Sequence, residues 1–205
     1  MSVNEWFSGE GWKEIPADIL ARPYAARFAA FMTADAADIA TEVKSWQRGD
    51  GAELVTFVLR TERPQRPPVD IRYEEPAGVI FPKGDSAPLV ISMRDGFPDT
   101  EHQNLVPEGV PVCLCIDNRP WEDARLGWTP AELLQRISLW FRRAARGELH
   151  EAAQGAEPFF GGSELQIILP AEAISGAAAG KIELHGFLPP HSDGKHLIVR
   201  KPADI

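Results

Sequence analysis

The residues of this chain whose types and spacing suit covalent chemistry lie around its only two cysteines, Cys113 and Cys115. His102 and Asn104 precede them as a His-x-Asn sequence. A nucleophilic sulfur needs a way to become a thiolate and a hydrogen-bond donor for the oxyanion that forms at the carbon it attacks. Candidates for both lie within this short stretch, so we expect sulfur chemistry there.

The two cysteines also have a simpler interpretation as core residues. In an extended backbone Cys113 and Cys115 share one face, and Leu114 points to the other. By composition alone, both are small hydrophobic core residues, as most free cysteines are. The surrounding glycines, prolines and polar residues, and the flanking indole rings of Trp121 and Trp128, argue against that interpretation.

Bulk properties limit the classes of protein to be considered. The chain has 205 residues, which suits one domain with an extension, and 44% of its side chains are hydrophobic, enough for a core. A formal net charge of −9 argues against a nucleic-acid-binding protein, which normally has a basic face.

No run of about 18 apolar residues and no signal-peptide pattern occurs, so no membrane association is expected. Two cysteines and five scattered histidines do not suggest a zinc site, and we expect neither a metal nor another cofactor. Reduced thiols indicate a cytoplasmic location.

The hydrophobic pattern predicts an α+β fold in which a helix comes first and an antiparallel meander follows. The helical spacing begins at Pro23 and continues, in one helix or two, as far as Trp46. The expected strands of the meander cover residues 52–61, 69–73, 79–81 and 89–93. Residues 94–128 then form a long ordered loop, and loops of that length in a compact domain are usually functional.

A second helix is expected after this loop. Thr129 suits the N-cap, Pro130 the first helical position and Glu132 the third, and Gly147 suits the end. Four arginines lie on this helix, and a solvated face that complements the helix dipole is favoured over a binding patch. These are Arg136, Arg142, Arg143 and Arg146.

The stretch around Cys113 resembles the active-site region of the ubiquitin-conjugating enzymes. Their signature is His-Pro-Asn, then a glycine, then an apolar residue followed by Cys-Leu, and a tryptophan eight residues after the cysteine. In this chain residues 102–104 match the first part with Gln for Pro, and Gly109 and residues 112–114 match the second. Trp121 stands at the expected offset, and residues 128–130 resemble the helix entry of the family.

The prokaryotic members of this superfamily are a closer resemblance. They share Arg94-x-x-Phe97-Pro98 before the His-x-Asn sequence, and Trp-x-x-x-Ala-Ala-x-Gly-Glu-Leu-His over residues 140–150. Such bacterial proteins are typically encoded beside a ubiquitin-like protein, an adenylating activating enzyme and a JAB-type metallopeptidase, and they are associated with antiviral defence. The resemblance covers about residues 20–150 and implies a UBC-like fold.

The resemblance also implies roles for the site residues. The thiolate of Cys113 takes a ubiquitin-like C-terminus from the activating enzyme, and an amine, usually a target lysine, then attacks the new thioester. Asn104 is the donor to the oxyanion or ties down the loop, and His102 is structural rather than a proton carrier. Asp117 orients or deprotonates the lysine, or only caps the loop. Cys115 is a packing residue or a minor second thiol.

The chain departs from the usual pattern in several places. One more residue separates the His from the Cys, residues 122–127 are an insertion, and the tail beyond residue 160 replaces the helical C-terminus of eukaryotic relatives. The tail contains expected strands at 165–169, 182–187 and 196–200. We therefore expect a catalytic domain over residues 1–160 and a β-rich C-terminal extension over 161–205, packed on the same domain.

Three other interpretations stay open on the sequence. A non-catalytic adaptor of the same fold binds a ubiquitin-like protein or an activating enzyme without a reactive thiol. A cysteine hydrolase pairs Cys113 with a histidine, for which His150 and His185 are the distant candidates. The chain is alternatively one region of a longer polypeptide with an activating or peptidase domain.

Overall fold

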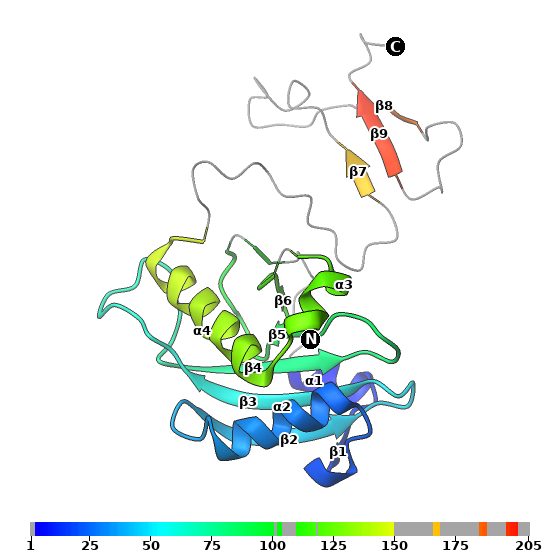
Figure 1. Cartoon of the computed structure of the whole chain (residues 1–205). Helices are drawn as coiled ribbons and strands as arrows, with labels where there is room; N and C mark the ends of the chain where they lie inside the picture. The colour runs from blue at the N-terminus through cyan, green and yellow to red at the C-terminus, as the bar shows by residue number, and fades with distance from the viewer. Residues whose placement is uncertain are drawn as a thin grey trace. The chain divides into compact units, whose positions relative to one another are not determined.

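The structure is a computed structural model of residues 1–205 (Figure 1). It describes residues 3–100, 102–103, 110–117 and 119–149, and the strand residues 166–168, 185–187 and 196–200. Its contacts divide the chain into two units, Met1–Phe159 and Phe160–Ile205. How the extension packs on the first unit stays a prediction.

A six-stranded sheet with the strands in chain order, each antiparallel to its neighbours, forms the centre of the first unit. The strands are β1 (Lys13–Ile15), β2 (Ala40–Gln47), β3 (Glu53–Arg60), β4 (Glu74–Phe81), β5 (Leu89–Ser92) and β6 (Cys113–Leu114). The expected order of a helix followed by an antiparallel meander is therefore confirmed.

Helices α2 (Pro23–Ala34) and α4 (Pro130–Arg146) contact each other and pack on one face of this sheet (Figure 1). Alternate strand residues build the core with them, because successive side chains of a strand point to opposite faces. Phe28 of α2, Phe57 of β3 and Phe141 of α4 are among its largest buried side chains.

The other face of the sheet carries a smaller apolar cluster. Trp12, Leu54 and Ile91 are buried in it, and Trp6 and Phe7 of α1 (Val3–Gly9) pack against it. The N-terminal aromatic residues therefore pack on the sheet, and both faces of the sheet are at least partly covered. No helix in the described part of the chain is long and apolar enough to cross a membrane.

The ends of α4 are as the sequence predicts. The Thr129 hydroxyl accepts a hydrogen bond from the Glu132 amide at 3.1 Å, which is an N-cap. Gly147 ends the helix in the left-handed conformation, with φ of 66°. These local signals are sufficient because both caps act within one turn of the helix.

The prediction that helical structure extends to Trp46 is wrong, because residues 40–47 form β2. The pairing of β2 with β3 shifts register between Thr41 and Lys44, and Glu42 has a positive φ of 53°. This bulge places both Ala40 and Val43 on the main core, three residues apart. The bulge thus imitates the spacing of a helix in the sequence.

The predicted strand at 69–73 is also wrong, and the expected short strand at 79–81 belongs to the longer β4. Ile71 is buried, as a strand residue would be. However, two of the backbone groups nearby bond side chains instead of a strand: the Arg72 amide donates to Glu75, and the Asp70 carbonyl accepts from Arg94. The alternation at 69–73 therefore reflects a loop that is pinned by buried side chains.

The long loop that was expected over 94–128 contains short elements. Besides β6, these are α3 (Trp121–Ala124) and the 3-10 turn η2 (Arg125–Gly127); a further 3-10 turn, η1 (Ala17–Ile19), precedes α2. The insertion at 122–127 is therefore helical. In the second unit β7 (Gln166–Ile168), β9 (His196–Arg200) and β8 (His185–Phe187) form a sheet in that order, near the expected positions.

Candidate functional site

Cys113 lies on β6, the last strand of the sheet, where it pairs with Ile91 of β5. Leu114 beside it is buried in the main core, together with partly buried Val112 and Ile116. Cys113 instead packs against the smaller cluster on the opposite face. The predicted alternation is thus confirmed for Val112, Cys113, Leu114 and Ile116, and the Cys113 thiol does not point into the main core.

Burial decides the ionisation of this thiol. Cys113 is half-buried, and burial raises the pKa of its thiol above the ordinary value. A thiolate in that position loses hydration that the neutral thiol does not need. The free protein therefore holds Cys113 mainly as a neutral thiol near pH 7, and a nucleophilic role requires removal of its proton during the reaction.

The His102–Gln103 segment lies directly against β6. The carbonyl of His102 accepts a hydrogen bond from the Cys115 amide at 2.8 Å, and Gln103 forms an antiparallel bridge with Leu114. His102 adopts a positive φ of 57°, and the Thr100 hydroxyl lies 3.0 Å from the Gln103 side-chain oxygen. The structure therefore brings the first two residues of the His-x-Asn sequence next to the cysteine segment.

Asn104 lies outside the described residues, as do Gly109, Asn118 and His150. Its predicted part in the site accordingly stays a prediction. What the structure describes is its sequence neighbour Gln103, whose bridge partner Leu114 is adjacent to Cys113.

Asp117 is tied into a group of charged side chains at the start of α4. Arg119 donates to its carboxylate from the backbone amide and from the guanidinium, the shortest bond being 2.7 Å. Arg136 of α4 lies 3.5 Å from the same carboxylate. Glu132 accepts from both arginines and completes the group. The chain just after Cys113 is therefore attached to the helix that follows it.

These arginines also determine the ionisation of Asp117. Burial alone raises the pKa of this carboxyl, but the hydrogen bonds from Arg119 and the positive charge of Arg136 outweigh burial and lower the pKa. The side chain is 21% exposed and is a carboxylate at neutral pH. A carboxylate of low pKa that is already bonded to arginine is a weak proton acceptor, which favours its use as a tie for the loop.

The inserted residues 122–127 are attached through the tryptophans on either side of them. The ring of Tyr24 lies edge-on to Trp121 at 5.6 Å and to Trp128 at 4.7 Å. The Trp121 indole donates to Asp85 at 3.0 Å, and Arg125 forms an ion pair with the same carboxylate. The insertion thus joins α2 to the turn between β4 and β5.

Two buried carboxylates were not anticipated from the sequence. Glu53 accepts from the amides of Ala21 and Arg22 and so fixes the chain before α2. Glu75 is paired with Arg94 beneath the loop that leads to His102. Glutamate within a strand pattern is normally placed on the solvent face, and no local signal distinguishes these two.

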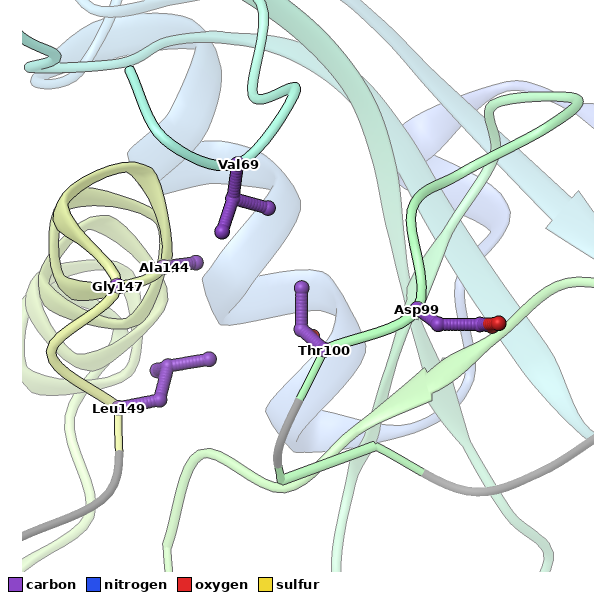
Figure 2. Close-up of a pocket in the computed structure, with 6 residues that line it drawn as sticks. All are labelled: Val69, Asp99, Thr100, Ala144, Gly147 and Leu149. Carbon is purple, nitrogen blue, oxygen red and sulfur yellow. The ribbon is translucent and has the colours of Figure 1, made fainter. Parts of the chain in front are cut away.

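A cavity of about 410 Å³ lies elsewhere, where the end of α4 meets two loops. Figure 2 shows Val69, Ala144 and Leu149 around a common space, and the Asp99 carboxylate points away from it. Thr100 and Gly147 also line it, and neither cysteine is among the lining residues that the structure describes. Among the described residues there is no cluster of three His, Cys, Asp or Glu side chains that would suit a metal ion.

An α+β fold with an antiparallel meander, followed by a cysteine segment and a long helix, is consistent with the E2-like class of conjugating proteins. A family model described as prokaryotic E2 family A matches residues 40–179, and the chain belongs to this family. The match includes β2 to α4 and both cysteines. A search of curated proteins found no match.

Membership of an E2 family indicates a conjugating-type role at a coarse level. In general terms it also implies two kinds of partner, a ubiquitin-like protein and an activating enzyme. It does not by itself assign a role to any single residue.

Proposed function

We propose that this protein accepts a ubiquitin-like protein on Cys113 and transfers it to an amine, in the context of bacterial antiphage defence. The ubiquitin-like protein arrives as a thioester on an adenylating activating enzyme. The Cys113 thiol gives up its proton as its sulfur attacks the thioester carbonyl, a new carbon–sulfur bond forms, the bond to the activating enzyme's sulfur breaks, and the departing thiolate takes up a proton. A target lysine amine then attacks the Cys113 thioester, the Cys113 thiolate leaves, and the amine nitrogen loses a proton.

The position of Cys113 supports this assignment most strongly. It lies on the last strand of the sheet, outside the main core, and the His102–Gln103 segment pairs with the residues that follow it. Cys115, by contrast, donates its amide to His102. We assign Cys115 to packing because the spacing of the family signature places Cys113, and not Cys115, at the position of the nucleophile.

The remaining residues serve mainly to position groups in this proposal. A thioester is already activated toward amines, so the catalyst needs orientation and oxyanion stabilisation more than a strong base. We assign oxyanion stabilisation to the Asn104 amide, which follows Gln103 in the sequence. His102 is a structural residue whose carbonyl anchors the segment, and Asp117 holds the loop to α4 through Arg119 and Arg136.

The raised pKa of Cys113 fits a thiol that works only inside a complex. A thiolate of high pKa is the stronger nucleophile once formed, although little of it exists in the free protein. Loading then depends on the activating enzyme to bring the two sulfur atoms together, which limits reaction with unrelated electrophiles.

The decisive experiment combines the protein with its ubiquitin-like protein, activating enzyme and ATP, and follows adduct formation on non-reducing gels. Cys113→Ala is expected to abolish a thiol-sensitive adduct, and Cys115→Ala is the matched control that keeps it. An adduct that persists in Cys113→Ala rejects the assignment. Binding of the activating enzyme without an adduct in the wild-type protein would instead favour a non-catalytic adaptor.

A further inference from the structure

Arg94 and Glu75 form a buried ion pair below the loop that leads to the cysteine segment. The Arg94 Nη1 atom lies 3.0 Å from the Glu75 Oε1 atom, and their side chains are 2% and 0% exposed. Burial raises the pKa of Glu75 and lowers the pKa of Arg94, in each case against the charged form. Among the described residues, Glu75 Oε2, Arg94 Nε and Arg94 Nη1 have no hydrogen-bond partner, so the 3.0 Å contact is an ion pair without a well-aligned hydrogen bond. Burial of the pair therefore carries a desolvation cost that apolar side chains in the same space would not have.

Stability alone does not explain such a pair. Replacement of a buried ion pair by apolar side chains of similar volume is often neutral or stabilising, because two charges no longer have to leave water. Retention of charge in a buried position is instead explained when the charges hold a particular geometry. The contacts of Arg94 and Glu75 identify which parts of the chain they hold.

The pair fixes two loops at the end of the sheet. The Arg94 guanidinium donates to the carbonyl of Asp70 at 2.6 Å, and Glu75 accepts from the amide of Arg72 at 2.6 Å. The guanidinium also lies 5.1 Å from the ring centre of Phe97. The loop at 70–72 and the chain after β5 are thus held by one buried group.

Phe97 connects the ion pair to α4 and to the chain that leads to the cysteine segment. Its ring lies 6.2 Å from both Trp140 and Phe141 of α4. Thr100, three residues further on, contacts Gln103. From there the backbone of His102–Gln103 joins Leu114 and Cys115.

We propose that Arg94, together with Glu75, is a positioning residue that holds the His102–Gln103 segment against β6 through Phe97. In this proposal the pair acts through the chain between Phe97 and Gln103. The predicted effect on transfer to lysine rests on the function proposed above. The predicted effect on the His102–Cys115 hydrogen bond is independent of that function.

The test uses the full chain with an apolar replacement of the pair, Arg94→Met with Glu75→Leu. The matched control replaces an exposed pair, Arg142→Met with Glu62→Leu, whose atoms lie 3.4 Å apart at the protein surface. Hydrogen exchange of the Cys115 amide reports directly on its bond to His102. We expect it to exchange on the order of tenfold faster in the buried variant only, with the exchange of the β3 amides unchanged.

The second measurement is single-turnover transfer from Cys113 to free lysine at saturating concentration. Misplacement of groups by about 1 Å costs up to about 100-fold in rate. We expect transfer to slow by at least tenfold on that scale in the buried variant, while loading and the apparent lysine affinity are retained. If even the wild-type protein forms no adduct, the proposed function fails, and the exchange data still decide the positioning role.

Unchanged exchange of the Cys115 amide in a folded buried variant would overturn the proposal. Should the double replacement fail to fold, Arg94→Lys takes its place, because it keeps a buried charge but loses the planar group that reaches Glu75 and Asp70 together. Faster Cys115 exchange in folded Arg94→Lys supports the proposal, and wild-type exchange rejects it.

Discussion

The carbonyl of His102 and the amide of Cys115 are joined by a hydrogen bond of 2.8 Å, which brings the His-x-Asn sequence against the strand of Cys113. His102 adopts a left-handed backbone conformation to make this contact. Few non-glycine residues adopt that conformation without a supporting contact. The backbone of His102 therefore has a defined structural use, whatever its imidazole does.

The raised pKa of Cys113 predicts slow alkylation at neutral pH. Iodoacetamide is expected to modify Cys113 more slowly in the folded protein than in urea. The rate should rise with pH, and its midpoint should lie at a higher pH in the folded protein than in the unfolded chain. Mass spectrometry of the peptide that contains Cys113 measures both rates. A midpoint equal to that of the unfolded chain would contradict the burial argument.

The raised pKa of Cys113 also predicts how the stability of the protein changes with pH. The folded state favours the neutral thiol, so its contribution is complete below the unfolded thiol pKa of about 8.5 and is lost as pH rises through the higher folded value. The free energy of unfolding should therefore fall less at alkaline pH in Cys113→Ser than in the wild-type protein. Urea titrations at several pH values give this difference, with Cys115→Ser as the control.

The variant Asp117→Asn distinguishes between two roles of this carboxylate, one that only holds the loop and one that accepts a proton. If the carboxylate only binds Arg119 and Arg136, the variant should lose about 1 kcal/mol of stability or less and show a transfer rate with an unchanged pH profile. A base at this position would instead remove one limb of the profile. Arg136→Gln, which removes the partner on α4, should resemble Asp117→Asn in both measurements.

The lowered pKa of Asp117 determines where this contribution is lost. Its folded-state pKa lies below the unfolded value, so the contribution is present above about pH 3.9 and disappears as pH falls through the folded value. The stability difference between wild type and Asp117→Asn should therefore be constant near neutrality and shrink in acid.

The N-cap of α4 provides a prediction independent of function. Thr129→Ala removes the acceptor for the Glu132 amide and should cost about 1 kcal/mol in unfolding free energy. Thr33→Ala is the matched control, because that exposed hydroxyl bonds only carbonyls within α2 and its loss should change stability by less than about 0.5 kcal/mol. Equal effects would contradict the cap.

Trp121 holds the inserted helix α3, and Leu126 of the following turn η2 is exposed to solvent. Trp121→Ala removes the contacts with Tyr24 and Asp85 and should speed tryptic cleavage after Arg125 on the order of tenfold through local opening. Leu126→Ala, at a side chain that is 84% exposed, should leave both cleavage and stability unchanged. Equal cleavage in the two variants would show that Trp121 does not hold the insertion.

Elements with short-range signals were predictable. The Thr-Pro-Ala-Glu start and the Gly147 stop define α4, and the apolar runs at 52–61 and 89–93 contain β3 and β5. The choice of Cys113 over Cys115 came from the resemblance to the signature of the ubiquitin-conjugating enzymes, as did the pairing of Asn104 with it. Those two assignments remain predictions about chemistry.

The failures share a physical cause. The bulge at Glu42 exists because β2 pairs with β3, and the loop at 69–73 is held by Glu75 and Arg94, so neither is coded within a local window. A pattern of burial is visible in the sequence, but the partner that causes the burial is not.

The sequence by itself determined the general order of helix, antiparallel meander, cysteine segment and second helix, together with the family signature, because periodicity, caps and spacing are properties of neighbouring residues. Only the tertiary structure decided three contacts. The His102 carbonyl bonds the Cys115 amide, Arg119 and Arg136 form ion pairs with Asp117, and Arg94 is buried with Glu75. Each of these contacts joins different elements, and side-chain charge and burial depend on which elements meet.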